Sequence, residues 1–154
     1  MRRLAKAVAS VFYVGHARFA PGTLGSGAGL IIYYVVKDNV ILYGFAIAFL
    51  FALGILFAGE AEKIYGKKDA RAIVIDEACG MLLALFLVPY HVMAVVTGFI
   101  LFRLLDIFKL PPARKLETMK GSFGVMADDI VSAVYTNAIL QILIRMLHIF
   151  GKLG

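Results

Sequence analysis

The sequence predicts an all-α fold, a polytopic membrane bundle of about four to five apolar helices with an interfacial helix at the N-terminus. Of the 154 residues, 62% are hydrophobic and the mean hydropathy is +0.89, which is too apolar for an ordinary soluble domain. Residues 40–59 contain no charged side chain, and this is about the length that a helix needs to cross the hydrocarbon core. We therefore expect a single membrane-embedded domain over residues 1–154.

The other apolar segments complete this bundle in chain order. Residues 1–13 combine basic and apolar residues, which predicts an amphipathic helix at the membrane interface. Residues 24–36 are shorter and begin with several glycines, so they fit a full span, a half-span or a helix buried among the others. Residues 79–102 are interrupted by the sequence Pro-Tyr-His, which predicts two helices joined by a tight turn. Residues 130–144 form the last apolar segment.

The basic residues give the bundle an orientation. If the chain crosses the membrane at each apolar segment, the spans run over residues 24–36, 40–59, 74–88, 91–102 and 129–147. Thirteen of the sixteen basic residues then fall on one side, which the positive-inside rule places in the cytoplasm. The net charge of +6 favours anionic lipid head groups, whereas basic residues that flank spans argue against a nucleic-acid partner.

Carboxylates gather on the same side. Acidic side chains are costly near lipid, and yet five of them lie at the edges of apolar segments: Asp76, Glu77, Asp106, Asp128 and Asp129. An acid at the start of a helix often only complements the helix dipole. Two adjacent acids exceed that need, because neighbouring side chains on a helix diverge by about 100° and the second can point into the bundle. The pairs 76–77 and 128–129 are therefore candidates for a site as well as for helix caps.

Cationic and small residues accompany these acids. Arg103 and Lys109 lie three residues either side of Asp106, where they form either surface ion pairs or an anion site. Residues 20–27 are rich in glycine and carry two hydroxyl side chains, and glycines that lead into a helix leave backbone N–H groups available to an anion. The same glycines also fit a turn or close helix packing. Hard oxygen ligands for Mg²⁺ beside cationic groups for phosphate together indicate phosphoryl chemistry on a lipid.

Four ordered motifs resemble those of the phosphatidylglycerophosphatase A family and cover nearly the whole chain: Ala-Pro-Gly-Thr-Leu-Gly-Ser at 20–26, Ile-Val-Ile-Asp-Glu-Ala-Cys-Gly at 73–80, Phe-Arg-Leu-Leu-Asp-Ile-Phe-Lys at 102–109 and Gly-Val-Met-Ala-Asp-Asp-Ile at 124–130. The resemblance implies a Mg²⁺-dependent, multi-pass enzyme of the bacterial inner membrane with its active site on the cytoplasmic side. It would convert the phospholipid phosphatidylglycerophosphate to phosphatidylglycerol and inorganic phosphate. The chain departs from the family pattern at Leu110, which separates Lys109 from the following Pro111.

Residue-by-residue matching of these motifs implies three overlapping sets of site residues. The catalytic set is Asp76, Glu77, Asp106, Asp128 and Asp129. The metal ligands are Asp76, Glu77, Asp128 and Asp129, and the phosphate-binding set is Thr23, Ser26, Arg103 and Lys109. The attacking group is left open between a water molecule and one of the aspartates.

Two other function classes fit parts of the pattern. A divalent-cation transporter would use intramembrane acids, but at several depths instead of at one face. A non-catalytic membrane scaffold would explain apolar helices and caps, but not acids repeatedly accompanied by anion-binding loops. Within the phosphatase class, another lipid phosphomonoester offers the same reacting group. Small residues on the helices are compatible with a homo-oligomer.

Overall fold

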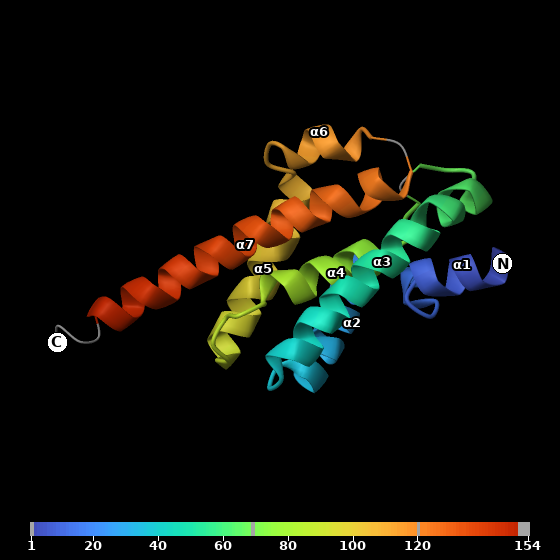
Figure 1. The fold of residues 1–154 in the computed structure, drawn as a ribbon. Helices are drawn as coiled ribbons and strands as arrows, with labels where there is room; N and C mark the ends of the chain where they lie inside the picture. Colours follow the sequence, from blue (N-terminus) through green and yellow to red (C-terminus); the bar gives the residue numbers. More distant parts are fainter. Residues whose placement is uncertain (1, 69, 120, 151–154) are drawn as a thin grey trace.

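The computed structural model describes residues 2–68, 70–119 and 121–150, without the side chains of Glu117 and of residues 148–150. Within these ranges the chain is all-helical, as the sequence predicts, and contains no strand. Its helices are α1 Arg2–Ala9, α2 Pro21–Val36, α3 Val40–Tyr65, α4 Ile75–Ala84, α5 Val92–Phe108, α6 Ala113–Glu117 and α7 Ser122–Phe150, with a 3₁₀ turn, η1, at Val14–His16 (Figure 1). Lys120 and Lys152, which count among the basic residues above, lie outside the described residues.

Within the described residues, α3 and α7 are the two helices that are long and apolar enough to cross a membrane. α3 has 26 residues, about 39 Å at 1.5 Å per residue. It begins after Asn39, whose side-chain oxygen accepts hydrogen bonds from the backbone N–H groups of Ile41 and Leu42, and it ends at the left-handed Gly66. Only 11% of the most apolar stretch of α3 and 22% of that of α7 is buried. Both helices therefore present apolar faces outward, as membrane-spanning helices do.

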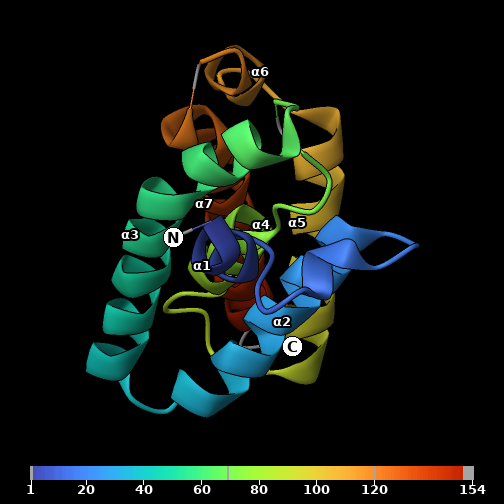
Figure 2. The same cartoon turned by 90° about the vertical axis from the view of Figure 1, so that its right-hand side faces the viewer.

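α4 is a short helix at the centre of the bundle, packed against α2, α3 and α7 (Figure 1, Figure 2). Its Met81 and Leu82 side chains are fully buried. The close crossing with α2 needs a glycine, because a Cβ on Gly29 would lie 2.6 Å from the carbonyl oxygen of Ala78. The ten residues of α4 reach only about 15 Å. The helix is therefore shorter than the span predicted over residues 74–88.

The break predicted inside residues 79–102 is confirmed. α4 ends at Ala84 and α5 begins at Val92, so the link between them is longer than the tight turn that the sequence predicts. α7 holds this link in place, because the side-chain amide of Asn137 donates a hydrogen bond to the carbonyl oxygen of Phe86 at 2.7 Å.

Two helix ends differ from the sequence expectation. α1 ends at Ala9, four residues before the predicted end, and residues 11–13 all adopt left-handed backbone angles. α7 begins at Ser122, seven residues before its predicted start, and the Ser122 hydroxyl oxygen accepts a hydrogen bond from the Gly59 N–H of α3 at 2.7 Å. Residues 128–129 therefore lie in the second turn of α7, and their interpretation as a helix cap is wrong.

Candidate active site

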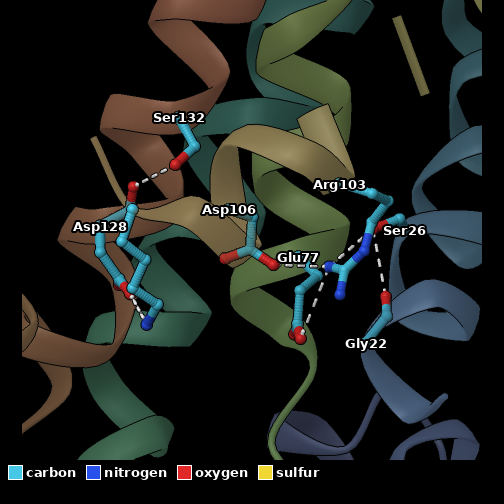
Figure 3. A network of polar contacts seen from close by, with 8 residues as sticks. Gly22, Ser26, Glu77, Arg103, Asp106, Asp128 and Ser132 are labelled. Atoms are coloured by element: carbon cyan, nitrogen blue, oxygen red, sulfur yellow. Dashed lines mark hydrogen bonds and ion pairs between the residues drawn. The ribbon is translucent and has the colours of Figure 1, made fainter. Parts of the chain in front are cut away.

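The structure brings together all five acids singled out in the sequence. They come from three helices, two of them from the first turn of α4, one from the last turn of α5 and two from α7. A cavity of about 230 Å³ lies between these helices, and Figure 3 shows several of its side chains. The residues that line it are Asp76, Glu77, Asp106, Ile107, Lys109, Asp128 and Asp129.

Asp129 is shared by two groups of carboxylates. One oxygen from each of Asp76, Glu77 and Asp129 lies within 4.8 Å of the others. The same holds for Asp106, Asp128 and Asp129. The residues Asp76, Asp128 and Asp129 are only 6%, 5% and 3% exposed. Carboxylates so close together and so deeply buried repel one another, and such groups are stable only when they are protonated, paired or bound to a metal.

The carboxylate cluster carries more negative than positive charge. Its five acids face two bases, Arg103 and Lys109, which leaves a formal charge of −3 when all are ionised. Oε2 of Glu77 and Oδ2 of Asp129 are buried and accept no hydrogen bond from the described residues. Burial also raises the pKa of the Glu77 carboxyl above its ordinary value. The excess charge and the two oxygens fit a bound cation, and carboxylate oxygens are the ligands that Mg²⁺ prefers.

Arg103 joins the carboxylate cluster to the start of α2. Its Nη1 lies 2.9 Å from Asp106 Oδ2, 4.0 Å from Glu77 Oε1 and 3.5 Å from the hydroxyl oxygen of Ser26 (Figure 3). Its Nε is buried and donates no hydrogen bond within the described part of the chain. A guanidinium held in this way by two carboxylates still has a donor for a phosphate oxygen.

Gly22 allows the contact between α2 and the carboxylate cluster because it has no side chain. A Cβ at this position would lie 2.4 Å from Glu77 Oε1 and 2.8 Å from Arg103 Nη2. The Ser26 hydroxyl donates a hydrogen bond to the Gly22 carbonyl oxygen at 3.1 Å, within the first turns of α2. The absence of a side chain at Gly22 therefore lets the N-terminal turn of α2 pack directly against the carboxylate cluster.

Lys109 pairs with Asp128 of α7, and Figure 3 shows Asp128 on the opposite side of Asp106 from Arg103. It ends α5 with a left-handed backbone (φ 47°), and its Nζ lies 2.7 Å from Asp128 Oδ2. The insertion of Leu110 therefore does not turn Lys109 away from the cavity. Tyr135 of α7 holds the chain just beyond, because its hydroxyl donates a hydrogen bond to the carbonyl oxygen of Pro111 at 2.7 Å.

The predicted site residues and those in the structure do not agree completely. Of the four predicted phosphate-binding residues, only Lys109 lines the cavity, whereas Thr23, Ser26 and Arg103 do not. Arg103 and Ser26 are connected to the carboxylate cluster through the guanidinium of Arg103. Thr23 lies in the first turn of α2, and its side chain makes no hydrogen bond or ion pair with the described residues.

Sequence analysis missed Ile107, which lines the cavity but carries no chemical signal. It also missed Tyr135. This residue could have been predicted to lie on the same face of the helix as Asp128, because it follows Asp128 by seven residues.

Comparisons with known proteins place the chain among lipid phosphatases. A model of the family described as "Phosphatidylglycerophosphatase A" matches residues 7–144. A protein of Bacteroides thetaiotaomicron named "Putative phosphatidylinositol-3-phosphatase" is 35% identical over 141 residues, which cover 85% of this chain and 87% of that protein. The Escherichia coli protein named "Phosphatidylglycerophosphatase A" is 33% identical over 132 residues, covering 84% and 77%. The Haemophilus influenzae protein of the same name is 33% identical over 120 residues, covering 75% and 74%. No solved structure matches the chain significantly.

Proposed function

The chain belongs to the phosphatidylglycerophosphatase A family and is a phosphatidylglycerophosphatase, and from this premise we propose that it hydrolyses its substrate with Mg²⁺ in the cavity around Asp129. The products are phosphatidylglycerol and inorganic phosphate. The observation that carries the site assignment is the sharing of Asp129 between two carboxylate groups, with Arg103 and Lys109 beside them. We further propose that the protein crosses a bacterial inner membrane several times, with this cavity on the cytoplasmic side. The outward apolar faces of α3 and α7 and the one-sided basic residues support that placement.

The proposed Mg²⁺ ligands are carboxylates of α4 and α7: Asp76, Glu77, Asp128 and Asp129. Asp106 has a different role in this proposal. Its Oδ2 is engaged by Arg103 at 2.9 Å, so it orients the guanidinium toward the cavity. When bound, Mg²⁺ would neutralise the phosphate dianion and favour deprotonation of the attacking water.

The two cations beside the carboxylates bind and orient the phosphate. Arg103 pairs with Asp106 and Lys109 pairs with Asp128, so the two cations can contact two different phosphate oxygens. They stabilise the charge on those oxygens as the ester bond breaks. In one route, water attacks phosphorus and gives its proton to a cavity carboxylate, while the ester oxygen leaves with the lipid and takes up a proton. In the other, an aspartate attacks first and water then hydrolyses the aspartyl phosphate.

A second candidate substrate is another lipid phosphomonoester. The name of the Bacteroides thetaiotaomicron relative specifies a phosphatidylinositol 3-phosphatase. Such a lipid offers the same reacting group on a different head group. A cavity of about 230 Å³ accommodates a phosphate and its cations but not a complete phospholipid. Head-group selectivity therefore depends on surfaces outside the cavity.

Phosphate release from purified protein in detergent tests the proposal. We would compare phosphatidylglycerophosphate, phosphatidylinositol 3-phosphate and phosphatidic acid, each with Mg²⁺ and with a chelator. The variants are Asp129→Asn and Asp76→Asn, and the matched control is Asp38→Asn. Asp38 is an exposed acid that pairs with Lys37, before the start of α3 and outside the cavity.

We expect Mg²⁺-dependent release from phosphatidylglycerophosphate that both cavity variants lose and the control retains. Thermal melting of each variant confirms that it is folded. Release that survives in folded Asp129→Asn and Asp76→Asn would refute the site assignment. If the folded native protein releases no phosphate from any of these lipids but carries Mg²⁺ across a liposome membrane, the transporter hypothesis replaces the phosphatase.

A further inference from the structure

Three aromatic side chains are exposed on the segment between α1 and α2, outside the apolar helices. We call residues 11–20 the aromatic loop. Phe12 and Phe19 are 83% and 84% exposed, more than any other large apolar side chain in the described residues, and Tyr13 is 55% exposed. Figure 2 shows this segment projecting from the bundle beside the start of α2. Phenylalanine exposed to this extent on a loop is unfavourable in water, so the loop fits a partner that is partly apolar.

The aromatic loop is held in an unusual backbone conformation. Val11, Phe12, Tyr13 and Ala20 have positive φ angles of 47°, 52°, 70° and 44°. Residues other than glycine rarely adopt such backbone angles, and for a β-branched residue such as Val11 they are especially unfavourable. The conformation persists because the base of the loop is tied down. Tyr13 N–H donates to the Ser10 hydroxyl oxygen at 3.0 Å, within the same turn.

The base of the aromatic loop rests on the residues that lead into α4. Val74 N–H donates to the carbonyl oxygen of Ala9 at 2.9 Å. Gly15 fits against this segment so closely that a Cβ on it would lie 2.1 Å from the carbonyl oxygen of Ala72. Asp76 and Glu77 follow directly in the first turn of α4. The loop is thus rigidly connected to the start of the helix that carries two of the cavity carboxylates.

The charges around the aromatic loop indicate which kind of partner the loop contacts. Arg18 is exposed next to Phe19, and Arg2 and Arg3 are exposed on α1. Part of the apolar surface of α1 is already covered, because Ala9 packs with alanines of α3 and is fully buried, whereas Leu4 is exposed. Tyrosine is enriched at the head-group level of a bilayer, phenylalanine on interfacial segments enters the boundary with the acyl chains, and arginine is attracted to anionic lipids. The charge and the exposed rings therefore match a lipid surface.

We propose that the aromatic loop is a membrane-interface anchor, in which Phe12 and Phe19 insert at the head-group level of an anionic bilayer. Because the loop is tied to the start of α4 and continues into α2, its depth sets the height of the cavity relative to lipid phosphates. This consequence for catalysis rests on the proposed phosphatase function, whereas the anchor itself does not.

Fluorescence quenching tests the anchor without any activity measurement. The chain contains no Trp, so Phe12→Trp and Phe19→Trp each introduce a single tryptophan, whose emission is excited selectively. Each variant is reconstituted in vesicles that contain anionic lipid and lipids brominated at defined depths. Two further variants calibrate the depth. Phe49→Trp reports on the exposed face of α3, and Lys67→Trp reports on the exposed turn after α3.

We expect bromines near the head group to quench both loop fluorophores most strongly, deep bromines to quench Phe49→Trp, and no bromine to quench Lys67→Trp. Three results would overturn the anchor: loop fluorophores that no brominated lipid quenches, loop fluorophores quenched only by the deepest bromines, or loop fluorophores protected because a second copy of the chain covers them. Crosslinking of the same samples identifies the last case.

Kinetics test the consequence for catalysis. The double variant Phe12→Ser/Phe19→Ser should raise KM for substrate in vesicles several-fold and leave kcat unchanged, with no change for a short-chain, water-soluble lipid phosphate. The matched control is Leu87→Ser, an exposed apolar residue with a positive φ in the link between α4 and α5. Equal KM values for the double variant and the native protein on vesicles would refute the positioning role, even if quenching confirms insertion.

Discussion

Lys109 Nζ lies 2.7 Å from Asp128 Oδ2 and joins the C-terminal end of α5 to the second turn of α7. Six residues earlier on the same helix, Arg103 contacts Asp106 and reaches Glu77 and Ser26 on two other helices. The last part of α5 therefore supplies both cations of the carboxylate cluster: Lys109 lines the cavity, and Arg103 contacts two of its carboxylates. The acids from α4 and α7 can be held close together partly because these two cations reduce their repulsion.

Removal of the charge of Lys109 should strengthen Mg²⁺ binding and weaken substrate binding. In Lys109→Gln the cavity becomes more negative, so the Mg²⁺ concentration for half-maximal activity should fall while KM for the lipid rises. We expect kcat to fall by about 10²-fold, as for loss of one charge-stabilising group in an active site. Steady-state kinetics at varied Mg²⁺ measure all three quantities. The control is Lys63→Gln, whose native ammonium pairs with Glu60 on the exposed surface. An unchanged KM for the lipid would contradict the phosphate-binding role.

Mg²⁺ should stabilise the native protein against unfolding. Binding to the folded state alone contributes about 2.7 kcal/mol at a hundredfold excess over Kd, so the melting temperature in detergent should rise on addition of Mg²⁺. Asp129→Asn should abolish most of this rise, because Asp129 belongs to both carboxylate groups. In the presence of a chelator, the same variant should melt at the native temperature or above it, since it loses one buried negative charge. A full Mg²⁺-induced rise in Asp129→Asn would argue against Asp129 as a ligand.

Gly22→Ala should impair activity although it adds only one methyl group. The new Cβ would lie 2.4 Å from Glu77 Oε1 and 2.8 Å from Arg103 Nη2, so α2 must move or the ion pair must break. We expect a drop in kcat/KM of about 10–100-fold, the usual effect of displacing groups that orient a metal site. Gly27→Ala on the same helix is the matched control, because its Cβ meets no atom within 4 Å. Equal activity in the two variants would show that the approach of α2 is not needed.

Cys79 should be dispensable for catalysis. It is fully buried, and its Sγ faces the carbonyl oxygen of Ile47 at 3.8 Å instead of the cavity. Cys79→Ala should therefore retain native kcat and KM, while its free energy of unfolding falls by about 1 kcal/mol from the lost packing. Phosphate release and thermal melting check both statements. Loss of activity in a folded Cys79→Ala protein would point to a thiol-based mechanism.

The parts of the fold that were predicted correctly depend on local composition. α3 follows from an uninterrupted apolar segment, and the break between α4 and α5 follows from Pro89. The early start of α7 did not follow from its sequence, because one contact at that start joins Ser122 to Gly59, 63 positions away. α6 has only five residues and was not predicted. Its sequence has no apolar periodicity long enough to indicate a helix.

For the site as well, local features could be predicted from the sequence, whereas contacts between helices could not. Sequence by itself determined which chemical groups are available, five carboxylates and two cations at the ends of apolar segments, because residue type and hydropathy are properties of short stretches of chain. Only the tertiary structure decided that Asp129 is shared between two carboxylate groups, that Gly22 must lack a side chain and that Thr23 stays outside the cavity. These facts are distances between helices, such as that from Arg103 to Ser26, 77 positions apart. Helix packing fixes them, since side chains that interdigitate set how closely and at what point two helices cross.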